Sequence, residues 1–190
     1  WLILCMVMIA SPVSAKVFNA ESFTLDNGLE VVIIPKKFAP AITSMVWYKV
    51  GAADEPQGLS GMAHYFEHLM FKGTEALAPG EFSKTIKKLG GNDNAFTGQD
   101  YTAYFQSISK DHLPRILEME ADRMVNLSVP PTHFASEKKV VLEERRQRTE
   151  NDPSGLFTEQ MKSALFINHP YGTPVIGWMD EIKGYEWDDV

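Results

Sequence analysis

The chain contains very little cysteine: its 190 residues include one, Cys5. Cys5 lies in an apolar stretch at the start of the sequence, which is interpreted below as a leader. The sequence that follows can therefore form no disulfide within itself. It also offers no thiolate as a catalytic nucleophile or as a metal ligand, so a disulfide scaffold and a cysteine-dependent enzyme are both excluded.

Positive charge is also scarce, because 18 lysines and arginines face 25 aspartates and glutamates, for a net charge of -7. This balance argues against a nucleic-acid binder, which must neutralise phosphates. After the first residues no apolar run approaches the roughly 20 residues of a membrane-spanning helix, so we expect no membrane span in the mature chain. The composition, 44% hydrophobic and 23% charged, is ordinary for one globular domain.

The first fifteen residues have the pattern of a secretory signal peptide. Leu2 to Ala10 form an apolar run, and the small residues of Val13-Ser14-Ala15 follow as a cleavage site. No initiating methionine or basic segment precedes the run, so we interpret residues 1–15 as a truncated signal peptide. We therefore expect an exported protein, and its lack of mature cysteine suits the bacterial periplasm.

Residue patterns along the rest of the chain predict strands first and helices later. Asp26-Asn27-Gly28 is a strong hairpin turn. Strands or extended segments are expected at 22–25, 29–34, 41–50, 95–97 and 101–108. Helices are expected at 60–70, 81–89, 113–126, 132–149 and 156–166. Ser60 is the expected N-cap of the first of these helices, and Thr132 is the expected N-cap of the fourth. Because no regular strand–helix alternation appears, we predict an α+β fold, a mixed and largely antiparallel sheet with helices packed on one face.

The segment His64-Tyr65-Phe66-Glu67-His68 is an H-x-x-E-H motif. On a helix with about 100° per residue, His68 lies about 40° from His64 and Glu67 about 60° the other way. Both imidazoles can therefore reach one ion. A catalytic zinc takes such nitrogens, a third protein ligand and a water. Glu67 is then placed to accept a proton from that water.

The third ligand is expected among the carboxylates of the 132–149 helix. Glu144 lies about 20° from Glu137 around this helix, on the apolar face that also carries Phe134, Val140 and Val141. Glu143 points about 120° away, towards solvent. A carboxylate on a core-facing stripe is unfavourable unless it is paired or binds metal. The pattern therefore favours Glu144 as ligand and Glu137 as its orienting partner; the alternative is that both carboxylates pair with buried arginine.

Beyond these residues, the sequence after the leader resembles the N-terminal domain of the pitrilysin/insulinase-type zinc peptidases, family M16. That family includes the mitochondrial processing peptidase and bacterial periplasmic zinc peptidases. Its glutamate ligand follows the second histidine by about 76 residues, as Glu144 follows His68. The matching segments are 61–74 (GMAHYFEHLMFKGT), 90–97 (GGNDNAFT), Glu137, 140–144 (VVLEE) and 169–174 (HPYGTP).

The resemblance implies a zinc metalloendopeptidase with the two-layer pitrilysin-type fold. Residues 16–190 would be its N-terminal zinc-binding domain, incomplete because a second half, which supplies an Arg and a Tyr, is missing. One zinc ion per chain would be bound by His64, His68 and Glu144, with Glu67 as general base and Glu137 steadying the site. An extended peptide or unfolded protein would pair with an edge strand at Asn94, Ala95, Phe96 and Thr97, with Phe96 lining a side-chain pocket. The chain could form a homodimer or pair with a related subunit.

Two other functions are weighed against this one. The S-ribosylhomocysteine lyases share a related fold and an H-x-x-E-H metal site, but they are cytosolic and use a cysteine in catalysis. This chain has a leader and no mature cysteine. Some members of the peptidase family are non-catalytic partner or scaffold subunits. Those members usually lack motif residues, and all the motif residues are present here.

Overall fold

A computed structural model describes residues 19–189, so the predicted signal peptide at 1–15 lies outside the described residues. The chain divides into two compact units after Pro40. In the first unit, strands β1 (Glu21–Thr24) and β2 (Glu30–Ile33) pair antiparallel. The turn between them places Gly28 at φ 86°, a backbone conformation that glycine adopts without strain. This hairpin confirms the prediction from Asp26-Asn27-Gly28.

The second unit contains a three-stranded sheet in the order β3-β5-β4. Its strands are β3 (Ala41–Tyr48), β4 (Asn92–Thr97) and β5 (Thr102–Ser109), and both pairings are antiparallel. Ala103 at the centre of the sheet lies opposite Trp47 on one side and Phe96 on the other. Within residues 19–189, β4 pairs with β5 alone, so its outer edge is open there.

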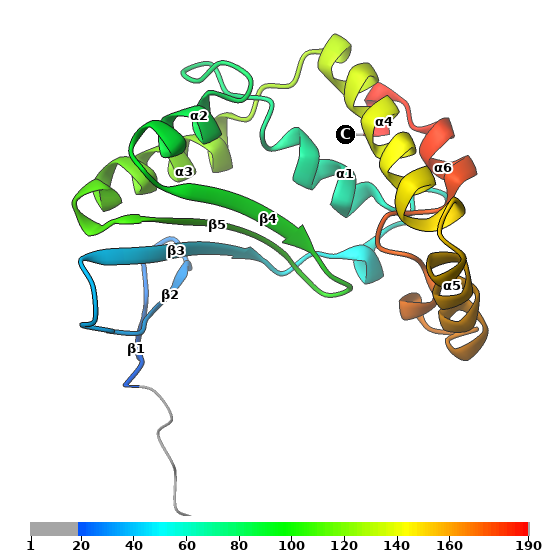
Figure 1. Cartoon of the computed structure of the whole chain (residues 1–190), viewed down its shortest axis with the longest axis horizontal. Helices are drawn as coiled ribbons and strands as arrows, with labels where there is room; N and C mark the ends of the chain where they lie inside the picture. The colour runs from blue at the N-terminus through cyan, green and yellow to red at the C-terminus, as the bar shows by residue number, and fades with distance from the viewer. Residues whose placement is uncertain (1–18, 190) are drawn as a thin grey trace, which may run out of the picture. The chain divides into compact units, whose positions relative to one another are not determined.

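Helices α1 (Met62–Leu69), α2 (Glu81–Lys88) and α3 (Leu113–Asn126) lie on one side of this sheet (Figure 1). Alternate residues of β5 face them and are buried: Tyr104, Gln106 and Ile108. The resulting core between α2, α3 and β5 consists of Leu77, Phe82, Ile86, Ile108, Ile116 and Met119. The predicted α+β class, with helices on one face of an antiparallel sheet, is confirmed.

A second core joins α1 to α4 (Pro131–Arg145) and to α6 (Met179–Gly184). Its buried members are Met62, Tyr65, Leu69, Phe134, Val141, Ile182 and Tyr185. The Tyr65 hydroxyl donates to the Phe134 carbonyl at 2.5 Å, so α1 is held to the start of α4 by a hydrogen bond as well as by apolar contact. This core fixes the distance between the two helices that carry the predicted ligands.

The caps predicted for two helices are wrong. α1 begins at Met62, and Ser60 is not its cap, because the Ser60 hydroxyl accepts a hydrogen bond from the Trp178 amide at 2.9 Å. Instead the Glu55 carboxylate accepts from the amides of Gly61 (2.7 Å) and Ala63 (2.8 Å), which satisfies two of the amides at the start of the helix. Thr132 is likewise not a cap, since α4 begins one residue earlier, at a proline.

The helix predicted to reach Thr149 changes character on the way. α4 ends at Arg145 and runs on into a π-helical turn, η3 (Arg146–Glu150). Asp152 then caps α5 (Pro153–Leu165) by accepting from the amides of Ser154 (3.2 Å) and Gly155 (3.0 Å), so α5 begins three residues earlier than predicted. The helix α6 was not predicted. The remaining short helical turns are η1 (Ala52–Asp54), η2 (Lys110–His112), η4 (Pro170–Gly172) and η5 (Trp187–Asp189).

None of the helices within residues 19–189 combines the length and the apolar character that a membrane crossing requires.

Candidate metal centre

Helix α1 presents two faces with different chemistry. Tyr65 and Leu69 are fully buried in the core that α1 shares with α4 and α6. His64, Glu67 and His68 all line a single cavity on another side of the helix. Helical periodicity alone produces this division, because residues three and four positions apart share a face.

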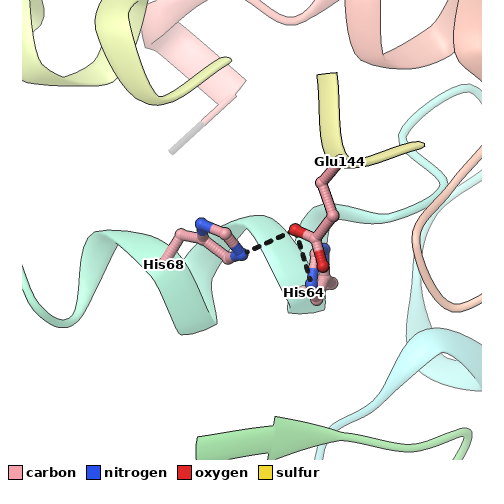
Figure 2. Close-up of side chains that lie close together, drawn as sticks. All are labelled: His64, His68 and Glu144. Carbon is pink, nitrogen blue, oxygen red and sulfur yellow. Dashed lines mark ion pairs between the residues drawn. The ribbon is translucent and has the colours of Figure 1, made fainter. Parts of the chain in front are cut away.

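Glu144, near the end of α4, meets the two histidines of α1 (Figure 2). Its Oε2 atom lies 3.2 Å from His68 Nε2 and 3.7 Å from His64 Nε2. One ligand atom from each of the three residues lies within 4.8 Å of the others, a spacing that one ion can bridge. Two imidazole nitrogens and one carboxylate oxygen form the donor set of many catalytic zinc sites. The residues present therefore fit a zinc ion.

His68 is oriented by a second carboxylate. Its Nδ1 atom lies 2.9 Å from Glu137 Oε1, and the other Glu137 oxygen pairs with the Lys72 ammonium. Burial alone would raise the pKa of Glu137, but the hydrogen bonds from His68 and Lys72 outweigh it and lower that pKa. An ionised carboxylate can only accept, so Nδ1 carries a hydrogen on the side of Glu137, and Nε2 is the nitrogen that faces Glu144. His64 has no such partner: its Nδ1 is buried without a hydrogen-bonding group from residues 19–189.

The two histidines differ in charge because their surroundings differ. Burial, together with repulsion from His68, lowers the pKa of His64 to about 4. Burial would lower the pKa of His68 too, but the carboxylates of Glu137 and Glu144 outweigh it and raise that pKa to about 9. At neutral pH the metal-free site therefore holds a proton on His68, which an incoming cation must displace.

A hydrogen bond from the sheet fixes the orientation of the Glu67 carboxylate. The Thr97 hydroxyl, at the end of β4, donates to Glu67 Oε2 at 2.5 Å. Burial raises the pKa of Glu67, and the Thr97 hydrogen bond opposes that rise without cancelling it. A carboxylate in such surroundings is a stronger base than an exposed glutamate.

The site opens into a cavity of about 800 Å³. Its walls are formed by α1, β4, the end of α4 with η3, α5 and the loop 172–176. Asn94, Ala95, Phe96 and Thr97 all line it, on the strand whose outer edge is open. The Phe96 ring packs edge-on against Trp47 with ring centres 5.6 Å apart, which fixes its orientation on the sheet.

Two contacts hold the far wall of the cavity in place. The buried Arg145 guanidinium binds both Glu159 oxygens, at 2.8 and 3.0 Å, and donates to the Gly177 carbonyl at 2.7 Å. These bonds tie α5 and the loop before α6 to the end of α4. The same loop also packs closely against the start of α1. A Cβ on Gly61 would lie 2.4 Å from the Ile176 carbonyl oxygen, so only glycine fits there.

The structure brings the sequence-predicted residues together. His64, His68 and Glu144 converge, Glu137 touches His68, and Glu143 points away to pair with Arg146 at 3.2 Å. The alternative of pairing with buried arginine is wrong for Glu137, whose partners are His68 and Lys72, and for Glu144, whose arginine partner is an exposed Arg148.

Three contributors were not predicted from the sequence. They are Lys72, which forms an ion pair with Glu137, Thr97, whose hydroxyl donates to Glu67, and Arg148, which forms an ion pair with Glu144. The sequence held a signal for one of them, since Arg148 follows Glu144 by four positions, about one helical turn. The Lys72 and Thr97 contacts join distant parts of the chain and left no local pattern.

Comparison with known proteins places these residues in a family context. A sequence profile of the insulinase family, peptidase family M16, matches residues 30–178. The chain is 42% identical over 171 residues to the zinc protease PqqE of Helicobacter pylori, an alignment that covers 90% of this chain and 38% of PqqE. It is 36% identical over 157 residues to an uncharacterized zinc protease of Mycobacterium tuberculosis, covering 81% of this chain and 35% of that protein. The chain thus spans well under half the length of these relatives.

Solved structures agree with this comparison. The crystal structure of a protease from Helicobacter pylori superposes with a TM-score of 0.83 at 43% identity, covering 91% of this chain and 42% of that one. The periplasmic protease PqqL of Escherichia coli gives a TM-score of 0.79 at 23% identity, over 88% of this chain and 19% of that one. Pitrilysin gives 0.70, also at 23% identity, over 89% of this chain and 18% of that one. The last two likenesses concern the fold alone.

Proposed function

The chain belongs to the insulinase family, peptidase family M16, and on that premise we propose that it forms the metal-binding part of a zinc metalloendopeptidase. The observation that carries the proposal is the meeting of His64, His68 and Glu144, beside Glu67, in a cavity bordered by an open strand edge. One zinc ion per chain would be held by these three ligands. When bound, zinc would supply Lewis acidity, which lowers the pKa of water and polarises a carbonyl group.

Glu67 is the residue that moves the proton. Its carboxylate lies on the same helical face as the two histidines, and the Thr97 hydroxyl at Oε2 fixes its orientation. Because burial raises the pKa of Glu67, the carboxylate can accept a proton from the attacking water and hold it until the leaving amine takes it.

The substrate would be an extended peptide or an unfolded protein segment. The outer edge of β4 offers main-chain donors and acceptors, and an extended chain that pairs with Asn94–Thr97 adds a strand to the sheet. Thr97 lies on that strand and touches Glu67, so a peptide bond held along the strand would lie close to the general base. The contact with Trp47 fixes the orientation of the Phe96 ring, which would line a pocket for a side chain of the substrate.

Location and assembly are also proposed. The signal-like segment at 1–15 supports export, and export to a bacterial periplasm suits a mature chain without cysteine. The family resemblance supports a second, similarly folded half or a related subunit that closes the cavity, and association as a homodimer or heterodimer.

The test is Glu67→Gln, assayed with a quenched peptide substrate. We expect the variant to keep its zinc and to lose peptide cleavage by a hundredfold to ten-thousandfold, the usual contribution of a general base. Glu143→Gln is the matched control, because this nearby glutamate is exposed and pairs with Arg146 and Gln147. Unchanged turnover in Glu67→Gln would refute the assignment. A zinc-loaded wild type that cleaves nothing even when the second half is present would favour a non-catalytic partner subunit.

A further inference from the structure

The two oxygens of the Glu144 carboxylate have different partners. Oε2 faces the imidazoles of His64 and His68, whereas Oε1 lies 2.8 Å from the Nη1 atom of Arg148. We propose that Arg148 is a positioning residue, which orients Glu144 so that it presents a single oxygen to the metal. The proposal rests on the metal site proposed above and adds a residue to it.

Arg148 stands where the backbone itself departs from a regular helix. It occupies the middle of the π-helical turn η3, which continues α4 directly after Arg145. Isolated π-helical turns are uncommon and occur frequently at functional sites. From this turn the guanidinium reaches back four positions to Glu144, and Arg148 also lines the cavity that contains the histidines.

A neighbouring ion pair shows why this contact differs from an ordinary surface pair. Arg146 and Glu143 lie 3.2 Å apart with 48% and 54% of their side chains exposed, so water solvates both charges. Such pairs contribute little. The Arg148 side chain is 74% exposed, but that of Glu144 is only 17% exposed, and its second oxygen is committed to the histidines. The guanidinium therefore restrains a carboxylate that few other groups can reach.

Restraint of Glu144 has a consequence for metal binding. A carboxylate can bind a metal through one oxygen or through both, and the ion pair with Arg148 holds Oε1 away from the histidines, so that Oε2 is the oxygen that faces them. Without Arg148 the side chain can rotate and both oxygens can approach the ion. Removal of a positive charge also reduces repulsion of the cation. The proposal predicts that the loss of orientation outweighs that gain.

The first experiment measures Zn²⁺ affinity by competition with a chromophoric chelator, using the wild-type chain, Arg148→Ala, Arg148→Lys and Arg146→Ala. Groups that orient metal ligands commonly affect affinity by about tenfold to a hundredfold. We expect Arg148→Ala to bind Zn²⁺ about tenfold more weakly or worse, and Arg148→Lys to recover part of the loss. Arg146→Ala, the matched control, should bind as the wild type does. Unchanged or tighter binding by Arg148→Ala would overturn the proposal.

The second experiment reads the coordination directly. The chain is loaded with Co²⁺, whose visible absorption weakens when its coordination number rises above four. We expect weaker absorption in Arg148→Ala than in the wild type or in Arg146→Ala, because both Glu144 oxygens become available. Identical spectra would contradict the positioning role. A wild-type chain that binds neither ion would refute the proposed metal site itself, whereas equal binding by the wild type and Arg148→Ala would refute only the role of Arg148.

Discussion

The second unit of the chain contains two clusters of buried charge that are built from similar side chains but end in different surroundings. The sealed cluster consists of Glu120 and Arg123 on α3 with Gln106, Tyr104, Phe71 and Phe82 around them. The open cluster consists of His64, His68, Lys72, Glu137 and Glu144 between α1 and α4. Both contain a carboxylate held by a cation within a few ångströms.

The sealed cluster pairs its charges with each other, although Arg123 Nη1 and Gln106 Oε1 find no hydrogen-bond partner among the described residues. Arg123 Nη2 donates to Glu120 Oε1 at 2.5 Å, and the two side chains are 2% and 4% exposed. Aromatic rings stack over the guanidinium, with Phe82 at 4.4 Å and Tyr104 at 4.5 Å from its central carbon. Such stacking favours the cation and excludes water. None of these residues lines the cavity that contains the histidines, so this cluster has the features of a structural element.

The open cluster brings three potential metal-binding atoms together. The Nε2 atoms of both histidines and one Glu144 oxygen point at a common position, and that position borders the cavity. The Nδ1 atom of His68 faces Glu137, away from that position. Burial of charge is therefore common to both clusters. Convergence of three potential ligand atoms on an accessible point is what marks one of them as a metal site.

The largest expected effect is a loss of folding stability when the sealed cluster is disrupted. Arg123→Ala leaves the Glu120 carboxylate buried without its cation, and loss of one partner of a buried pair costs about 3–5 kcal/mol. Urea unfolding measures this loss, and zinc affinity should stay unchanged. Arg115→Ala is the control, because Arg115 pairs with Glu118 on the same helix with the same three-residue spacing but in solvent. A loss in Arg123→Ala no larger than the roughly 0–1 kcal/mol expected of the control would remove the distinction.

A smaller effect is expected on zinc affinity when the open cluster is altered. Glu137→Gln replaces the ionised acceptor on His68 Nδ1 with a neutral amide, which holds the imidazole hydrogen less firmly. Zinc should bind about tenfold to a hundredfold more weakly in a chelator competition assay. The unfolding free energy of the metal-free chain should fall less than in Arg123→Ala, because Lys72, the other partner of Glu137, can turn to solvent. Zinc affinity within twofold of that of Glu143→Gln would show that Glu137 does not orient the ligand.

The contrast also shows what the sequence could predict. His64, Glu67 and His68 were predicted together because one short helix carries all three, and helical periodicity separated Glu144 from Glu143 for the same reason. The β1–β2 hairpin followed from its turn residues. Each of these inferences uses neighbours along the chain.

Contacts between distant elements could not be predicted in this way. The Thr97 hydroxyl reaches Glu67 only because β4 packs beside α1, and Lys72 reaches Glu137 only because α1 packs on α4. The π-helical turn η3 reads like a continued α-helix in the sequence, because the two differ in hydrogen bonding and not in composition. Val140 was expected on the apolar face of α4 but is 49% exposed, since it lies at the margin of that face.

The most direct test of the account is the zinc content of the chain. Purified wild-type chain, His68→Ala, Glu144→Gln and Arg123→Lys would be dialysed against the same trace of Zn²⁺ and analysed for bound metal. We expect about one zinc per chain in the wild type and in Arg123→Lys, whose altered residue belongs to the sealed cluster, and almost none in the other two. A wild type without zinc, or His68→Ala and Glu144→Gln variants that retain it, would contradict the metal site.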